Sequence, residues 1–183
     1  MQLRAILLQS TFASVLTRVS AECLLSNKAG DEYGTIETNE SLCKTQGEGD
    51  WTFAMEVSQT GFPVFDGGNA FAGMVGNFGF AIYDHTCALK GSYDPGEEGN
   101  DCGTPYVIKE NFLDWVVDVT SIMADVGGSD FVFYYGNGKY STGNNHCGCS
   151  NEPDGLQGYT FCKCAFPVNG RPSSKKREIE FKA

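Results

Sequence analysis

The chain has 183 residues, with 13 basic and 23 acidic side chains that give a net charge of −10. This length suits a single domain large enough to bury a hydrophobic core. The negative charge argues against partners that need clustered lysine and arginine, so we expect neither nucleic acid nor an anionic membrane surface as a ligand. The sequence also lacks a nucleophile elbow, a phosphate-binding loop and a zinc-protease motif.

The N-terminus has the order of a secretory signal. Residues 1–4 carry a positive charge, residues 5–16 form an apolar run, and residues 19–21 read Val-Ser-Ala. We predict a signal peptide over 1–21, cleaved before Glu22, and a secreted, extracellular product without a membrane-inserted segment. Cleavage would remove two arginines and no acid, which changes the net charge to −12. The alternative is an amphipathic first helix of a cytosolic domain.

The next segment, 22–50, is polar and rich in turn residues, and its two cysteines predict that disulfides pin it to the domain. Asn39 begins the only Asn-x-Ser/Thr sequon and is a predicted glycosylation site. Residues 51–57 then alternate large apolar side chains with smaller or polar ones, which predicts a half-buried strand. Residues 70–90 are apolar and glycine-rich, and they fit either two strands joined at Gly76-Asn77 or one long bent strand.

Residues 91–103 form an acidic stretch that lacks the spacing of a calcium loop and reads as a solvated turn. Residues 107–126 carry a stripe of apolar residues at steps of three and four, which predicts an amphipathic helix that ends at Gly127-Gly128. The stripe consists of Ile108, Phe112, Trp115, Val119, Ile122 and Val126. A strand over 131–135 and a turn at 136–138 follow. The charged tail 171–183 includes Lys176-Arg177, a possible processing site.

Eight cysteines follow the predicted signal, and this even number indicates disulfides. They are Cys23, Cys43, Cys87, Cys102, Cys147, Cys149, Cys162 and Cys164. The last four form two Cys-x-Cys pairs, whose single intervening residue is tight for zinc ligation and wrong for a redox motif. In an extended chain, residues i and i+2 lie roughly 6.5–7 Å apart, too far for a usual direct bridge. Each cysteine should therefore bond elsewhere, and we expect no metal and no cofactor.

Two disulfide arrangements remain open. The two Cys-x-Cys pairs can bond to each other across the turn at 150–161, or one cysteine of each pair can bond to one of the four earlier cysteines. Spacing alone does not choose between them.

Only two histidines are present, His85 and His146. Together with Asp84 or Glu56 they are the only weak candidates for acid–base catalysis that the sequence offers, as in a small secreted ribonuclease. Isolated histidines are more often surface or capping residues, and the negative charge opposes an RNA substrate. We therefore do not expect an enzyme.

The layout resembles that of small secreted cysteine-rich effector proteins of fungi, and within them the necrosis-inducing-factor-like domain, over about residues 43–149. The corresponding segments are Trp51 to Phe53, Phe80 to Cys87, Ile108 to Val126 and Phe131 to Cys147. The two Cys-x-Cys pairs and the residues from Ser150 onward depart from that layout. The resemblance implies a killer-toxin-like α/β sandwich with a virulence or toxin-like role and no known catalytic residues.

Together these patterns predict one disulfide-rich α+β domain over 22–170, in which an antiparallel sheet packs against the helix at about 107–126 as a disulfide-stapled α/β sandwich. We expect a monomeric, non-enzymatic secreted effector that binds a host or competitor protein or glycan. Phe62, Phe65 and Tyr140 are the candidate exposed aromatics for this contact. The alternatives are a secreted ribonuclease-like hydrolase that uses His85 and His146, and an antimicrobial, killer-toxin-like protein.

Overall fold

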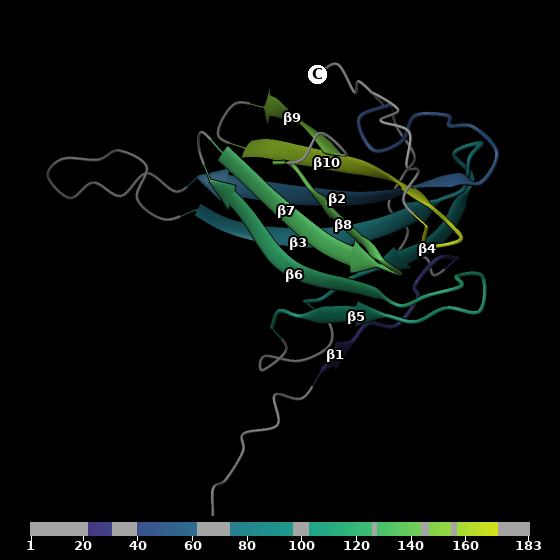
Figure 1. Cartoon of the computed structure of the whole chain (residues 1–183). Helices are drawn as coiled ribbons and strands as arrows, with labels where there is room; N and C mark the ends of the chain where they lie inside the picture. Colours follow the sequence, from purple (N-terminus) through teal and green to yellow (C-terminus); the bar gives the residue numbers. More distant parts are fainter. Residues whose placement is uncertain are drawn as a thin grey trace, which may run out of the picture.

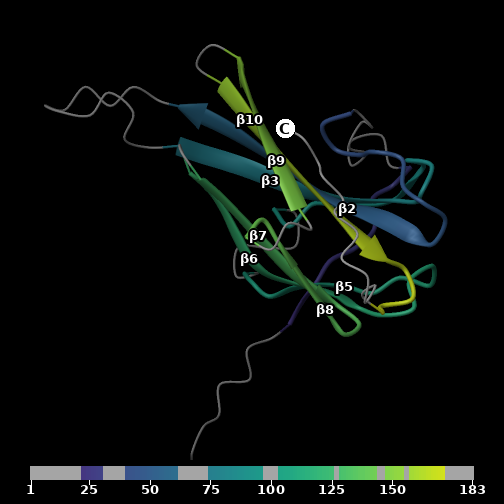
Figure 2. The same ribbon diagram turned by 45° about the horizontal axis from the view of Figure 1, so that its top comes forward.

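The fold consists of two five-stranded β-sheets packed face to face, as the computed structural model shows in two views (Figures 1 and 2). The structure describes residues 22–30, 40–61, 74–96, 103–125, 128–143, 147–154 and 157–171. Sheet A contains, in spatial order, β1 (Cys23–Leu24), β5 (Tyr106–Ile108), β6 (Val117–Asp125), β7 (Gly128–Tyr135) and β8 (Gly138–Ser141). Sheet B contains, in spatial order, β4 (Leu89–Tyr93), β3 (Met74–Tyr83), β2 (Asp50–Gly61), β10 (Gln157–Pro167) and β9 (Cys147–Asp154).

All strand pairs are antiparallel except the parallel pair of β1 and β5. The segment after β1 leaves sheet A and reaches the edge of sheet B. There the Lys28 amide donates to the Ser92 carbonyl at 2.7 Å, and the Asn27 side chain accepts from the Ser92 amide at 3.1 Å. The N-terminal end of the described chain therefore ties the two layers together.

The predicted α+β class is wrong, because the described residues contain no helix. The segment expected to form a helix instead contains β5, a stretch of turns and bends at 109–116, and β6. Val117 and Val119 point inward with the two-residue period of a strand, and a β-bulge at Thr120 then shifts the phase so that Ile122 faces Phe131. The bulge produced the three-residue step that looked helical.

The helical interpretation also predicted the wrong burial for Trp115 and Leu113. The helical stripe placed it in the core, yet 53% of its surface is exposed, whereas Leu113, which lies off the stripe, is buried. β-branched residues over 116–122 favour a strand, and this local preference agrees with the observed pairing.

The core lies between the inner faces of the two sheets and is dominated by aromatic rings. The ring of Phe53 on β2 lies 5.3 Å from that of Phe131 and 4.8 Å from that of Phe133, both on β7. On β10, Phe166 meets Tyr135 edge to face at 4.8 Å. The predicted strands at 51–57 and 131–135 are confirmed as β2 and β7. The glycine-rich segment 70–90 contains β3, which runs without a break through Gly76-Asn77, and the first two residues of β4.

The outer face of sheet B is also covered. A second buried cluster forms there from Leu42, Cys43, Ala54, Ala81, Tyr83 and Phe161. The disulfide between Cys43 and Cys87 holds the segment at 40–49 against this face. The outer face of sheet B is therefore buried over β2, β3 and β10, whereas its edge strands β4 and β9 keep exposed residues.

The two Cys-x-Cys pairs are bonded to each other across the β9–β10 hairpin, which is one of the two arrangements that the sequence left open. Cys147 bonds to Cys164 and Cys149 to Cys162, with Cα atoms 4.0 and 4.1 Å apart. The strand register sets these residues directly opposite each other, and the i, i+2 spacing sends both β10 sulfurs into the core. Cys23 is also disulfide-bonded, and Cys102 lies outside the described residues.

Candidate binding surface

The outer face of sheet A differs from that of sheet B because it presents apolar side chains to solvent. The strand registers align one outward-pointing residue from each strand in a single row. From β1 to β8 this row consists of Leu24, Val107, Asp118, Tyr134 and Lys139. We call the row, together with the adjacent Val116, Thr120 and Val132, the open face.

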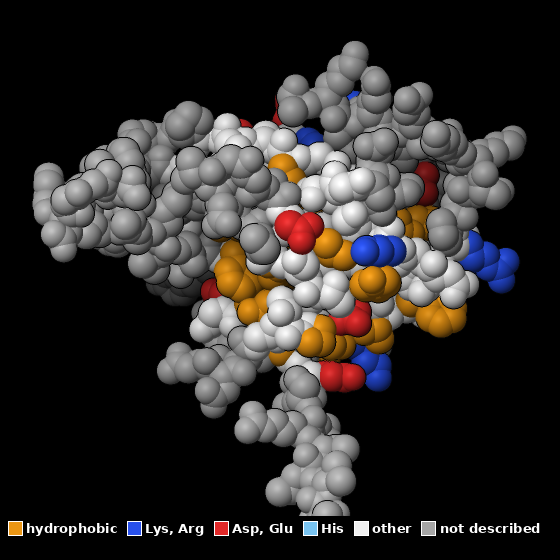
Figure 3. Space-filling model, turned by 60° about the vertical axis from the view of Figure 1, so that its left-hand side comes forward, with side chains coloured by type: hydrophobic (Ala, Val, Ile, Leu, Met, Phe, Trp, Pro, Cys, Tyr) orange, Lys and Arg blue, Asp and Glu red, His pale blue; other side chains and the backbone are white. Residues whose placement is uncertain are grey.

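Three of the four large hydrophobic residues that are exposed in the described part of the chain belong to the open face. They are Leu24 at 57%, Tyr134 at 42% and Val116 at 40% exposed, and the fourth is the neighbouring Trp115. Figure 3 shows apolar side chains interspersed with acidic and basic ones on the face that it brings forward. An exposed set of this kind on one sheet marks a contact surface better than scattered single residues do.

The residues one position away from this row point inward and are all buried. They are Cys23, Tyr106, Val119, Phe133 and Tyr140. The core therefore fixes the open face, because a slip of one residue in any strand would turn these buried side chains to solvent.

Asp118 lies in the middle of the row, between Val107 and Tyr134. Its Oδ1 atom is buried and has no hydrogen-bond partner among the described residues. Burial, together with the charge of Glu22 at the start of β1, raises the pKa of the Asp118 carboxyl group. Asp118 can therefore accept a hydrogen bond from a ligand that lies on this face.

Two further contacts order side chains on the outer face of sheet A, one beside Asp118 and one farther along β6 and β7. The Lys139 ammonium lies 5.9 Å from the centre of the Tyr134 ring, within reach of a cation–π interaction. The Ser121 hydroxyl donates to Asp130 at 2.8 Å. The open face thus combines an aromatic ring, apolar side chains and carboxylates on a rigid sheet.

Trp115 is held beside the open face by a network of loops at one end of the sandwich. Tyr135 accepts a hydrogen bond from the Asp114 amide at 3.2 Å and donates one to the Val168 carbonyl at 2.6 Å. Gly170 takes a φ of 66°, and a Cβ atom there would lie 2.5 Å from the Trp115 ring. The Trp115 indole therefore packs against Gly170, and the Tyr135 hydrogen bonds hold the loop that carries it.

The described residues do not test whether the predicted catalytic pair comes together. His85 lies in the turn between β3 and β4, and His146 lies outside the described residues. Asp84 is already used by this turn, where its Oδ1 atom accepts hydrogen bonds from the Thr86 amide at 2.9 Å, the Thr86 hydroxyl at 2.7 Å and the Ala88 amide at 3.0 Å. Although partial burial opposes the effect, these bonds and the charge of Lys90 lower the pKa of Asp84. Glu56 lies in β2 of sheet B, where burial raises its pKa.

The predicted contact aromatics also need correction. Tyr140 is 2% exposed because the alternation of β8 turns it inward, where its ring stacks on Phe133 at 4.9 Å. Phe62, Phe65 and the sequon at Asn39 lie outside the described residues. The alternation at 117–120 was the signal that could have revealed the outward position of Asp118, but the helical interpretation concealed it.

No family model, no curated protein and no solved structure matches this chain. The described residues contain no group of three or more histidine, cysteine or acidic side chains placed to hold a metal ion. They also contain no helix long and apolar enough to cross a membrane. The open face is therefore the feature of the described structure from which a function can be inferred.

Proposed function

We propose that this chain is a secreted effector-type protein that acts by binding a host or competitor molecule through the open face. The observation that carries the proposal is the contrast between the two outer faces. Sheet B is covered by its own chain, whereas Leu24 and Tyr134 of sheet A are exposed side by side with polar groups.

Two further observations support secretion and an effector role. Three disulfides within one chain are typical of proteins that fold in an oxidising compartment. The order of segments in the sequence resembles that of fungal cysteine-rich effectors, although the helix of that layout is replaced here by β5 and β6.

The proposal is tested with two double variants of the purified secreted protein. Leu24→Ser with Tyr134→Ser removes the exposed apolar groups from the open face, and both positions are exposed, so the fold should be retained. His85→Ala with His146→Ala serves as the matched control, because it leaves the open face unchanged. We measure binding of the labelled proteins to intact host cells and to competing microbes, together with the host response.

Loss of binding and response in the open-face variant, with both retained in the histidine variant, would support the proposal. Turnover of RNA or glycan that disappears on changing either histidine would favour the hydrolase instead. Inhibition of microbial growth without a host response would favour the antimicrobial alternative.

A further inference from the structure

The chemistry of the open face indicates what kind of partner it fits. Apolar side chains lie on both sides of a carboxylate, because the register places Val107 and Tyr134 next to Asp118 and Leu24 next to Val107. A flat sheet of this composition suits the side chains of another protein, which can bury the apolar groups while a polar atom reaches Asp118.

Asp118 requires a hydrogen-bond donor that the described residues do not supply. Its Oδ1 atom is buried without a partner, although the carboxyl group borders solvent. A ligand reaches the part of the carboxyl group that borders solvent, and because partial burial reduces the hydration of this group, a hydrogen bond to it is stronger than one to a fully hydrated carboxylate.

Charge decides which donor is favoured. Glu22 lies close enough to Asp118 to act on it electrostatically, and Lys139, the basic residue of the row, is separated from Asp118 by Tyr134, so the described residues contain no basic group in an ion pair with Asp118. The chain as a whole carries a net charge of −10, which becomes −12 after loss of residues 1–21. A cationic donor is therefore attracted both at long range and at the site, whereas a neutral hydroxyl group is attracted only by the local hydrogen bond.

We propose that the open face binds a basic protein surface, in which an arginine or lysine side chain pairs with Asp118 and flanking apolar side chains contact Leu24, Val107 and Tyr134. Arginine fits best, because its planar guanidinium group can donate two parallel hydrogen bonds to a carboxylate and can also stack on an aromatic ring. This inference rests on the proposed function and adds the chemical class of the partner.

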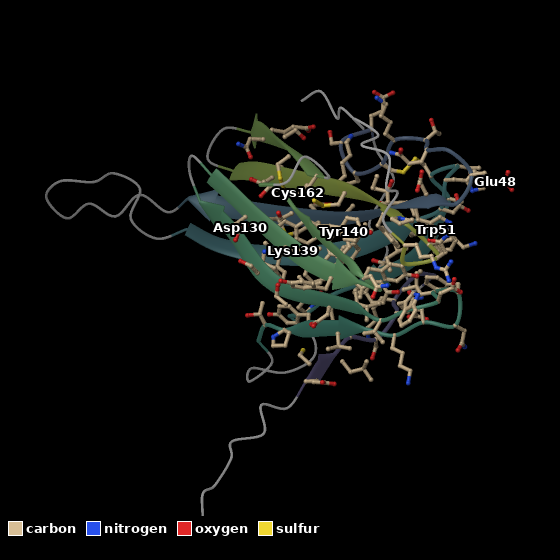
Figure 4. All side chains as sticks on the ribbon, viewed as in Figure 1. Glu48, Trp51, Asp130, Lys139, Tyr140 and Cys162 are labelled. Atoms are coloured by element: carbon tan, nitrogen blue, oxygen red, sulfur yellow. A yellow bond between two sulfur atoms is a disulfide. The ribbon has the colours of Figure 1, made fainter. Side chains whose placement is uncertain are left out.

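The test uses synthetic peptides as probes and three forms of the secreted protein. In the first peptide arginine and leucine alternate, in the second glutamate replaces arginine, and in the third serine replaces leucine. The proteins are the wild type, Asp118→Asn and Glu48→Gln. The last two lose the same charge, but Glu48 is exposed in the segment 40–49 that lies against the outer face of sheet B, just before β2 (Figure 4), whereas Asp118 lies on the outer face of sheet A.

We expect the arginine–leucine peptide to bind the wild type, and we expect each of the other two peptides to bind more weakly. Asp118→Asn should weaken binding of the arginine–leucine peptide about tenfold or more, because a hydrogen bond between charged groups is lost. Glu48→Gln should change binding less than about twofold, since it alters only a distant, screened charge. Asp118→Ser provides a second variant in case the asparagine amide forms a new bond.

Equal weakening by Asp118→Asn and Glu48→Gln would overturn the inference, because the attraction would then come from net charge alone. Binding of a neutral oligosaccharide that survives Asp118→Asn would also overturn it and identify a glycan surface. If the Leu24 and Tyr134 double variant loses its cellular target while both Asp118 variants keep it, the proposed function stands and the basic partner is refuted.

Discussion

The hydroxyl group of Tyr135, at the end of β7, joins two loops at one end of the sandwich, and replacement of Tyr135 by phenylalanine tests how much stability that junction contributes. The ring is fully buried against Phe166, so phenylalanine can occupy the same space. Burial raises the pKa of Tyr135, which keeps the hydroxyl protonated as the donor to Val168. The substitution removes this donor together with the acceptor for the backbone amides of Asp114 and Trp115.

The expected cost follows from the groups left behind. The substitution leaves the Val168 carbonyl and the Asp114 amide without the Tyr135 hydroxyl. Both hydrogen bonds are part-buried, and a typical intramolecular hydrogen bond contributes about 0.5–1.5 kcal/mol, so the two together should contribute about 1–3 kcal/mol. Thr52→Val is the matched control, since the Thr52 hydroxyl is fully buried but has no hydrogen-bond partner among the described residues. Replacing that hydroxyl with a methyl group should leave the free energy of unfolding unchanged or raise it.

The measurement is urea unfolding of the disulfide-intact proteins, followed by fluorescence and circular dichroism so that a two-state transition can be verified. Each kcal/mol lost should also lower Tm by about 2–4 °C for a domain of this size. If Tyr135→Phe lowered the free energy of unfolding by no more than Thr52→Val does, the reasoning about the loop junction would be refuted.

Three other properties follow from the structure. Removing the Cys43–Cys87 disulfide should cost about 4 kcal/mol, because it closes a sequence separation of 44 residues. Removing Cys149–Cys162 should cost less than about 3 kcal/mol, because Cys147–Cys164 still closes the same hairpin in the unfolded chain. Equal losses in urea unfolding would contradict this chain-entropy argument. Burial raises the pKa of Glu56 above its ordinary 4.5, so the native state binds this proton more tightly than the unfolded state does. The native state therefore loses stability as the pH rises from the ordinary pKa through the raised one. Glu56→Gln should therefore be more stable than the wild type at pH 7, with the difference vanishing below about pH 4 in a series of thermal melts. Acrylamide should quench the tryptophan fluorescence of a variant that retains only Trp115 more strongly than that of a variant that retains only Trp51. Equal quenching would argue that Trp115 is buried.

The helix over 107–126 was the main error of prediction, and its cause is local. Periodicity assumes that every residue advances the chain by the same angle, but the extra residue at Thr120 breaks that rule within a strand. Ile108 and Phe112 also fit the spacing of the predicted helix by chance, because Ile108 ends β5 and Phe112 lies in the turns that follow. No local pattern distinguishes a bulge from part of a helical step, because the bulge is defined by the partner strand β7.

The cysteine pairs show the opposite case. The single residue within each Cys-x-Cys motif predicts that both sulfurs leave an extended strand on the same side and bond elsewhere, and this geometry is observed. The choice of partners needed the β9–β10 register, which sets Cys149 opposite Cys162 and not one residue away.

By itself the sequence determined the properties that depend on neighbouring residues: the strands at 51–57 and 131–135, the turn at 136–138, the cysteine-rich character and the negative charge. The tertiary structure alone decided which strands are neighbours and which outer face is covered. Sheet B gained a cover because Cys43 reaches Cys87 across 44 residues, whereas the row through Asp118 and Tyr134 kept its apolar groups in solvent. Such contacts join residues far apart in the chain, and they leave no periodic trace in the sequence around either partner.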